Sequence, residues 1–217
     1  MFALQCLANA ALQDRAPGIF VAFEESPRQI VANGATFDWG LANLSAKKLF
    51  FMDAHLSPTL VKSGDFDLAG MLAMLAAKKQ EMGAQWIVFD GIDVLLTLLQ
   101  DPAAEMRELY RLRDWLADNA LTAILTAKAE SQSVEAARYG FLQFMVDCVV
   151  RLERRQEDRI SVKTLQITKY RGSGYEPAEF PLSFGPAGIH VGAATPPTIE
   201  HKASVERLSA GFDRLDV

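Results

Sequence analysis

GIFVAFEESP, at residues 18–27, joins a short apolar run, two adjacent acidic residues and a helix start. The run is apolar throughout, which is typical of a strand buried on both faces of a sheet. Ser26 followed by Pro27 predicts a helix, because serine is a favoured N-cap residue and proline is favoured at the first helical position. An apolar strand that leads directly into a helix indicates an α/β fold with a parallel sheet, and Glu24 and Glu25 would then follow the end of a strand.

The same alternation of strand and helix continues along the first 126 residues. Hydrophobic spacing predicts helices over residues 1–12, 65–82 and 102–117, and strands over 48–52, 86–90 and 121–126. Beyond Val146 the pattern changes to alternating strands joined by turns, at residues 148–153, 160–168 and 179–184. The fold class that we predict is therefore α/β, a mainly parallel twisted sheet flanked by helices with antiparallel strands toward the C-terminus.

Composition narrows the classes of function. The 217 residues are 50% hydrophobic with a net charge of −5, which argues against binding of nucleic acid or anionic lipid through a broad basic surface. Cys6 and Cys148 lie in apolar sequence, so we expect both to be buried and reduced. The histidines have no ligand spacing for zinc, and no apolar run reaches membrane-spanning length. No signal-peptide pattern opens the sequence, and we expect a cytoplasmic protein.

Acidic residues follow several of the predicted strands. Glu24 and Glu25 follow the first strand, Asp53 the second, and Asp90 ends the third. Ligands of open parallel sheets bind outside the carboxyl ends of the strands, so these acids indicate one shared site. Four apolar residues before Asp90 fit a Walker B strand, whose acid holds magnesium through water. Apolar strands also end in aspartate at ordinary turns, and that alternative stays open.

A basic segment, KYRGSG at residues 169–174, follows a strand of the C-terminal part. Lysine and arginine next to glycines are suited to contacting phosphate oxygens, and arginine can do so with two parallel hydrogen bonds. A basic hairpin turn without such a role is the alternative on residue type alone.

Seven segments, taken together and in order, carry a resemblance to a known family. They are FALQ at 2–5, GIFVAFEESP at 18–27, FDW at 37–39, GDFDL at 64–68, RELYRL at 107–112, ARYG at 137–140 and KYRG at 169–172. Over residues 1 to about 191 the chain resembles the KaiC family of ATPases. The resemblance implies a RecA-like P-loop NTPase core, usually duplicated in one polypeptide and assembled as a ring hexamer. It also implies ATP and magnesium as cofactors, with ATP held between neighbouring lobes, and signalling through protein partners.

The resemblance assigns roles to individual residues. Glu24 and Glu25 would be the catalytic carboxylates and Asp90 the magnesium-binding Walker B acid, while Lys169 and Arg171 would reach the γ-phosphate of ATP held by the adjacent subunit. The residues that would line the nucleotide are Thr36, Tyr170, Ser173 and Tyr175. Tyr175 stands where the clock protein has histidine, and Gly185-Pro186 stands where it has a Thr-Asp pair, so the adenine-side contacts differ from the family pattern.

The family's Walker A loop would directly precede Met1, and the pattern G-x-x-x-x-G-K-[ST] occurs nowhere in the sequence. We therefore expect that this chain alone does not hold Mg-ATP tightly. Residues 205–216 resemble the opening of a further lobe. We expect residues 1–191 to form one lobe that starts just after a P-loop, and residues 192–217 to form a linker and the beginning of a second lobe. The chain would then be a fragment of a two-lobe protein, or a natural protein that has lost its P-loop.

The lobe resembles the first of the family's two. The second lobe is autophosphorylated on a Ser-Thr pair, and Gln143-Phe144 occupies the corresponding position here, so any kinase activity would belong to a second lobe. The function that we expect is ATP hydrolysis at subunit interfaces of a signalling ring. The alternatives are a non-catalytic interaction module with a RecA-like shell, and a recombinase- or helicase-type lobe that acts on DNA.

Overall fold

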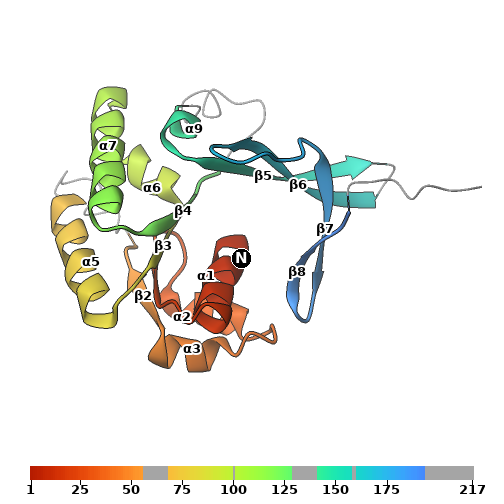
Figure 1. Cartoon of the computed structure of the whole chain (residues 1–217), viewed down its shortest axis with the longest axis horizontal. Coiled ribbons are helices and arrows are strands. Elements are labelled where there is room, and N and C mark those ends of the chain that lie inside the picture. Colours follow the sequence, from red (N-terminus) through yellow and green to blue (C-terminus); the bar gives the residue numbers. More distant parts are fainter. Residues whose placement is uncertain (56–67, 100, 129–140, 158–159, 194–217) are drawn as a thin grey trace, which may run out of the picture.

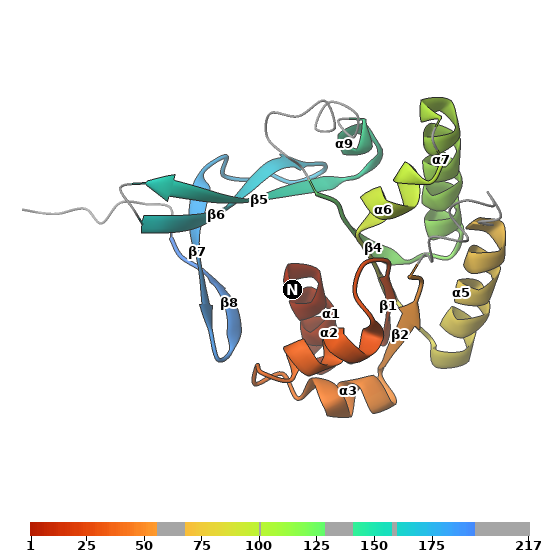
Figure 2. The same ribbon diagram turned by 180° about the vertical axis from the view of Figure 1, so that it is seen from behind.

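The computed structural model describes residues 1–55, 68–99, 101–128, 141–157 and 160–193. Within these residues the chain forms a parallel sheet covered by helices and a separate antiparallel sheet (Figure 1). Seen from behind, the antiparallel strands extend away from the helix-covered sheet (Figure 2). In the part of the chain that is described, no helix has the length and apolar character needed to cross a membrane. The ARYG segment, most of GDFDL and residues 194–217 lie outside the described residues.

The parallel sheet has the strand order β2-β1-β3-β4. Its strands are β1 (Gly18–Ala22), β2 (Leu49–Asp53), β3 (Trp86–Asp90) and β4 (Thr122–Thr126). Every pairing is parallel, and β1 lies between β2 and β3. All five residues of β1 are buried, as expected for a central strand covered on both faces. The predicted parallel α/β sheet is confirmed, with strand boundaries within one residue of the prediction.

Helices cover both faces of this sheet because successive side chains of a strand point to opposite faces. On one face, Phe20 and Val88 pack with α1 (Phe2–Gln13), α2 (Pro27–Gly34) and α3 (Leu41–Lys47). On the other face, Ile19, Val21, Ile87 and Phe89 pack with three further helices. These are α5 (Leu68–Met82), α6 (Ile92–Thr97) and α7 (Pro102–Asp118). The short helices α3 and α6 were not predicted, because two turns carry too little periodic signal.

The second sheet is antiparallel, in the order β5-β6-β7-β8. Its strands are β5 (Cys148–Glu157), β6 (Ile160–Tyr170), β7 (Glu179–Gly185) and β8 (Gly188–Val191), and the short helix α9 (Leu142–Met145) precedes it. Three of these strands were predicted and β8 was not. The prediction that Cys148 is buried is wrong: this thiol is exposed, whereas Cys6 is half-buried and burial raises the pKa of its thiol.

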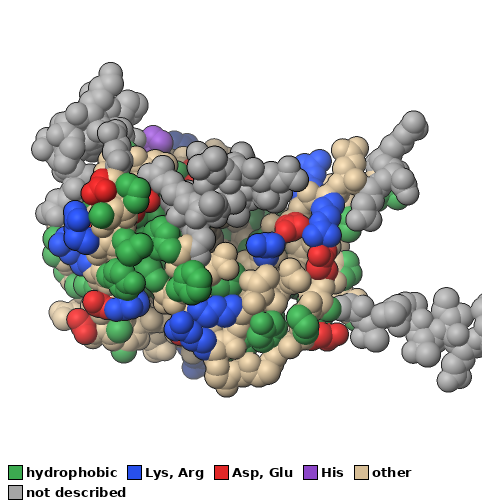
Figure 3. Space-filling model, turned by 90° about the horizontal axis from the view of Figure 1, so that it is seen from above, with side chains coloured by type: hydrophobic (Ala, Val, Ile, Leu, Met, Phe, Trp, Pro, Cys, Tyr) green, Lys and Arg blue, Asp and Glu red, His purple; other side chains and the backbone are tan. Residues whose placement is uncertain are grey.

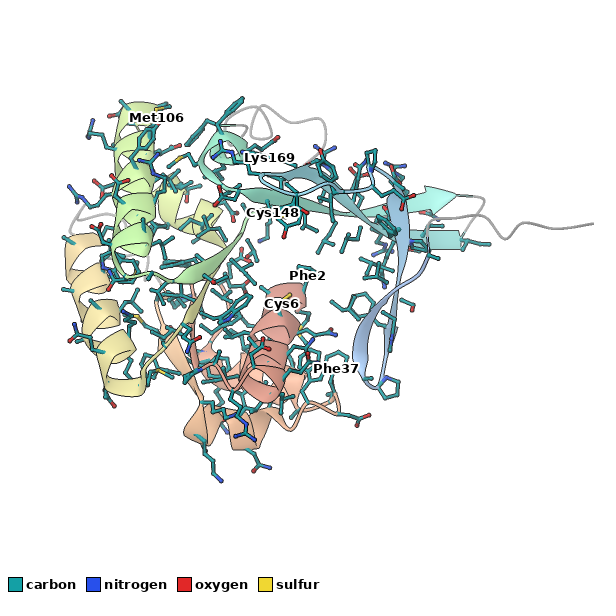
Figure 4. The ribbon with its side chains drawn as sticks, viewed as in Figure 1. Phe2, Cys6, Phe37, Met106, Cys148 and Lys169 are labelled. Atoms are coloured by element: carbon teal, nitrogen blue, oxygen red, sulfur yellow. The ribbon has the colours of Figure 1, made fainter. Side chains whose placement is uncertain are left out.

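The β7–β8 hairpin is joined to the helix-covered sheet by hydrogen bonds to its backbone. The Gln5 side chain donates to the Ile189 carbonyl at 3.2 Å and accepts from the Ile189 amide at 2.7 Å. The Trp39 indole donates to the Ala187 carbonyl at 2.9 Å. Figure 4 shows α1, which carries Phe2, Cys6 and Gln5, on the side of the sheet that faces this hairpin. The FALQ and FDW segments lie far from the hairpin in the sequence. These hydrogen bonds join them to it in the folded chain.

Gly188 allows this close approach. Its φ is +108°, and a Cβ built there would lie 2.6 Å from Gln5 Oε1 and 2.8 Å from Trp39 Cζ2. We expect Gly188→Ala to weaken the docking of the hairpin and lower the free energy of unfolding by about 1–3 kcal/mol, measured by urea denaturation. Gly83→Ala is the matched control, because Gly83 also has a positive φ of 67° with nothing within 4 Å of the added Cβ. An equal loss in both variants would show that backbone strain, not the contact, is responsible.

Candidate functional site

The register of the parallel sheet gathers polar side chains at its carboxyl edge. Ala22 of β1 pairs with both Asp53 of β2 and Asp90 of β3, and Asp90 pairs with Thr126 of β4. Because parallel strands end at the same edge, the four strand ends lie side by side. Glu24 continues from β1 at this edge, so the strand ends that carry Glu24, Asp53 and Asp90 lie at one edge of the sheet.

Asp90 is held by the end of the neighbouring strand. The Thr126 hydroxyl donates to Asp90 Oδ1 at 2.7 Å and accepts from the Gly91 amide at 2.9 Å. The Phe23 amide donates to the Asp90 carbonyl at 3.3 Å. One hydroxyl thus bridges the carboxylate and the backbone that follows it, which fixes the orientation of the Asp90 side chain. A carboxylate oriented in this way at the end of a buried strand is suited to hold a hydrated cation.

Glu24 lies across the sheet edge toward the ends of β3 and β4. Its Oε1 accepts a hydrogen bond from the Lys128 ammonium, which follows β4 by two residues. The Glu24 side chain passes close to Gly91, where an added Cβ would lie 3.0 Å from Glu24 Cγ. Gly91 has a φ of +84°, so glycine serves both the left-handed conformation and the close approach.

Glu25 takes a different direction from its neighbour. Its Oε1 accepts from the Asn33 side-chain amide at 2.8 Å, so it lies against α2. The Ser26 hydroxyl accepts from the Gln29 amide at 3.4 Å and begins α2 as the sequence predicted. Thr36, which was predicted to line a nucleotide, donates to the Asn33 carbonyl at 2.7 Å just beyond that helix. The two adjacent glutamates therefore have different partners: Glu24 contacts Lys128 and lies against Gly91, whereas Glu25 is bound to Asn33 of α2.

Two further aspartates border the same edge. Asp53 accepts from the His55 amide at 3.0 Å, a local turn contact. Asp93, in the first turn of α6, accepts from the Lys128 amide at 3.3 Å. Burial raises the pKa of the Asp93 carboxyl above its ordinary value of 3.8, and the nearby Glu24 charge acts in the same direction. The pKa of Lys128 is raised, chiefly by its hydrogen bond to Glu24.

The basic segment lies in a separate place, between the second sheet and α9. The Lys169 ammonium donates to the carbonyls of Gln143 and Val146, the latter at 2.6 Å. Arg171 donates to the Phe144 carbonyl at 2.9 Å and forms an ion pair with Asp147 at 3.5 Å. Both cations thus meet carbonyls at the end of α9, where the backbone dipoles favour positive charge. Figure 4 shows Lys169 beside α9.

The remaining candidates surround this segment and are exposed. Tyr170 ends β6, the Ser173 hydroxyl donates to the Gly174 carbonyl at 3.3 Å, and the Tyr175 hydroxyl donates to the Thr168 carbonyl at 3.1 Å. Figure 3, which looks onto the top of Figure 1, shows Lys and Arg side chains next to gathered hydrophobic side chains on this face. Most of the predicted site residues therefore fall in two groups, the carboxylates that follow or end the parallel strands and the residues of segment 169–175, whereas Thr36 lies apart, just beyond α2.

Three residues of the sheet edge were missed in the sequence: Asp93, Thr126 and Lys128. Thr126 ends β4 just as Asp90 ends β3, so the rule that identified Asp90 would also have found it. Lys128 gives no such signal, because only the alignment of β4 with β1 through β3 brings it to Glu24. Asp93 looks like an ordinary acid in the first turn of a helix, and that helix was itself not predicted.

Comparisons with known proteins agree with this architecture. The family model described as "ATPase: KaiC" matches residues 1–195. The "Circadian clock protein KaiC2" of Synechocystis sp. is 31% identical over 219 residues, covering 100% of this chain and 38% of that protein. The "Circadian clock oscillator protein KaiC" of Parathermosynechococcus lividus is 30% identical over 218 residues, covering 100% of this chain and 40% of that protein. The protein of the same name from Synechococcus elongatus is 31% identical over 218 residues, covering 100% of this chain and 42% of that protein.

The chain therefore spans about two fifths of the length of these curated relatives, and the whole of it is matched. The family model covers nine of every ten residues, from α1 to the end of the antiparallel sheet. The resemblance noted in the sequence agrees with this family match, and the predicted parallel α/β sheet is present. The chain belongs to the KaiC ATPase family.

Proposed function

We propose that this chain forms the hydrolytic part of a KaiC-type ATPase lobe, with ATP bound at the carboxyl edge of the parallel sheet. The observation that carries the proposal is the convergence of Glu24, Asp90 and Thr126 at this edge. Glu24 would act as the general base that takes a proton from the attacking water, since its side chain lies over Gly91, the residue directly after Asp90. Glu25, hydrogen-bonded to Asn33, would support the same segment from the side of α2.

Magnesium fits this edge as a cofactor of the nucleotide complex. Within the described residues, no group of three or more His, Cys, Asp or Glu side chains could hold a metal ion by itself. Magnesium bound with ATP needs only one or two carboxylates, because waters and phosphate oxygens supply its other ligands. Asp90, oriented by Thr126, would be that carboxylate. When bound, the ion neutralises the phosphate charge that develops during hydrolysis.

The phosphate-binding loop would come from sequence outside these 217 residues. β4 ends the parallel sheet in the described part of the chain, and its apolar residues Ala123, Ile124 and Leu125 stay partly exposed. A further strand beside β4 would cover them and would bring its own carboxyl end next to Asp90 and Thr126. This arrangement supports the proposal that the phosphate-binding loop and the hydrolytic residues of the lobe lie on adjoining strands.

ATP hydrolysis tests the assignment of the carboxylates. In the protein extended through the reading frame upstream of Met1, we expect Glu24→Gln to lower kcat by about 100-fold or more and Glu25→Gln to lower it less, measured by phosphate release with Mg-ATP. Glu81→Gln is the matched control, an exposed glutamate on α5 that pairs with Lys78.

Two results would contradict this assignment. An extended protein without any hydrolysis would remove the ATPase proposal, and Glu24→Gln at the wild-type rate would remove Glu24 as the base. If Glu24→Gln also left the cellular activity unchanged, a non-catalytic interaction module would be the better description. Salt-sensitive binding of DNA would instead favour a recombinase- or helicase-type lobe.

We further propose that Lys169 and Arg171 act on ATP held by the adjacent subunit of a ring, with Thr36, Tyr170, Ser173 and Tyr175 lining the nucleotide. The two groups of residues are supported by different elements, the sheet edge and α9, as expected if each belongs to a different half of an interface between copies. In this arrangement α9 holds both cations in place before the neighbouring subunit arrives.

Mixing two inactive variants tests this arrangement. Glu24→Gln subunits keep the basic residues, and Lys169→Ala/Arg171→Ala subunits keep the carboxylate. In rings assembled from equal amounts of both, about a quarter of the interfaces would combine intact halves, so we expect about a quarter of the wild-type hydrolysis rate to return. A mixture as inactive as its components would show that both groups act within one subunit. Size-exclusion chromatography with Mg-ATP checks assembly, and a strict monomer would defeat the ring proposal.

The acidic edge also predicts a dependence of stability on pH. Because the pKa of Asp93 is raised in the folded chain, its ionised form is disfavoured there, and its contribution to stability falls as pH rises from below 3.8 through the raised pKa. Asp93→Asn keeps an oxygen that can accept from the Lys128 amide but removes the charge. We expect the free energy of unfolding of Asp93→Asn, relative to that of the wild type, to increase as the pH is raised from about 3 to 7, measured by denaturation at each pH. Asp118→Asn, at an exposed position on α7, is the control; a parallel trend in both variants would contradict the prediction.

A further inference from the structure

Lys128 reaches across the parallel sheet to the carboxylate assigned as the base. It follows β4, while Glu24 follows β1, and β3 lies between these two strands. The ammonium donates to Glu24 Oε1 although the two residues are 104 positions apart in the chain. The side chain of Lys128 is 72% exposed and that of Glu24 38% exposed. An ion pair this exposed contributes little to folding, so stability does not explain it.

Both members of the pair are held by further contacts. The Lys128 backbone amide donates to Asp93 Oδ1 at 3.3 Å, which ties the exit of β4 to α6. Glu24 lies against Gly91, the residue directly after Asp90, where there is no Cβ to push it away. Glu24, Asp90 and Asp93 all act electrostatically on the Lys128 ammonium. The Lys128 ammonium therefore faces three carboxylates at the edge where the nucleotide would bind.

Glu24 needs such a partner in order to stay at this edge. Like charges repel, so a carboxylate next to Asp90 and Asp93 would turn outward into water unless a cation held it. Glutamate has three rotatable side-chain bonds, and a general base is effective only when it is held within hydrogen-bond reach of the proton it takes. Lys128 supplies the opposite charge from the far side of β3, which directs Glu24 over Gly91 rather than back toward α2.

We propose that Lys128 is a positioning residue of the ATPase site, whose ammonium holds the Glu24 carboxylate over Gly91, the residue directly after Asp90. The catalytic part of this inference rests on the proposed function, whereas the pairing of Lys128 with Glu24 does not. Lys128 acts through Glu24, so removing it affects the hydrolytic step and leaves nucleotide affinity and folding almost unchanged.

The kinetic experiment uses the extended protein and Mg-ATP. We expect Lys128→Met to lower kcat by about 10-fold with KM within about twofold, and Lys128→Arg to restore most of the loss. In a Glu24→Gln background, Lys128→Met should cause no further loss, because the group that Lys128 positions is already gone. Lys79→Met, on α5, is the matched control. A rise in KM at unchanged kcat, or losses that multiply in the double variant, would overturn the proposal.

A second measurement does not depend on hydrolysis. In the 217-residue chain, NMR of the lysine side chains follows the titration of Lys128, whose pKa we expect to lie above 10.5 in the wild type and to fall toward that value in Glu24→Gln. A Lys128 titration that does not respond to Glu24→Gln would overturn the pairing, even in an active enzyme. A clear response in a protein without ATPase activity would instead remove the proposed function and the catalytic role of Lys128 with it. Lys128→Met should shift the thermal midpoint by less than about 2 °C, and a larger loss would assign the pair to folding.

Discussion

The parallel pairing of β1 with both of its neighbours is the constraint on which the rest of the molecule depends. β1 is buried at every position, and its register sets Ala22 opposite Asp53 on one side and Asp90 on the other. Because parallel strands begin and end together, this register brings the segments after β1, β3 and β4 to one edge. A shift of one residue would reverse the faces of the apolar side chains and would also separate Glu24 from Asp90.

The same constraint creates an electrostatic problem at that edge. Glu24, Asp90 and Asp93 are brought together by strands and a helix whose positions are determined by apolar packing, not by charge. The chain compensates locally: the Thr126 hydroxyl donates to Asp90, and Lys128 supplies a cation to Glu24 and a backbone amide to Asp93. An oriented carboxylate at such an edge suits a cation whose other ligands are waters and phosphate oxygens.

The sequence was sufficient for those features that depend on local chemistry. Apolar runs predicted the parallel strands, and Ser26 with Pro27 predicted the start of α2, because caps and burial patterns are written in adjacent residues. Features that depend on tertiary packing were missed. Glu105 is an acidic residue in the first turn of α7, yet it is fully buried, because it lies one helical turn from Leu109 on the side of α7 that faces the core. Cys148 was expected to be buried and is exposed, at the first position of β5 in the second sheet.

The candidate site divides along the same line. Asp90 and Glu24 could be predicted because each comes at the end of an apolar strand, whereas the partner of Glu24 depends on which strand lies two places away in the sheet.

For the basic residues near α9, the residue types suggested contacts with phosphate, but the sequence did not reveal which groups hold the two side chains in place. The structure shows these groups. Lys169 uses two of its three donors on carbonyls, and Arg171 uses two guanidinium nitrogens on Phe144 and Asp147. Within the described residues, the third ammonium donor and the remaining guanidinium N–H groups have no recorded acceptor. α9 therefore fixes the direction of both cations without exhausting them, which is the preorganisation that a contact with a neighbouring subunit's phosphate would need.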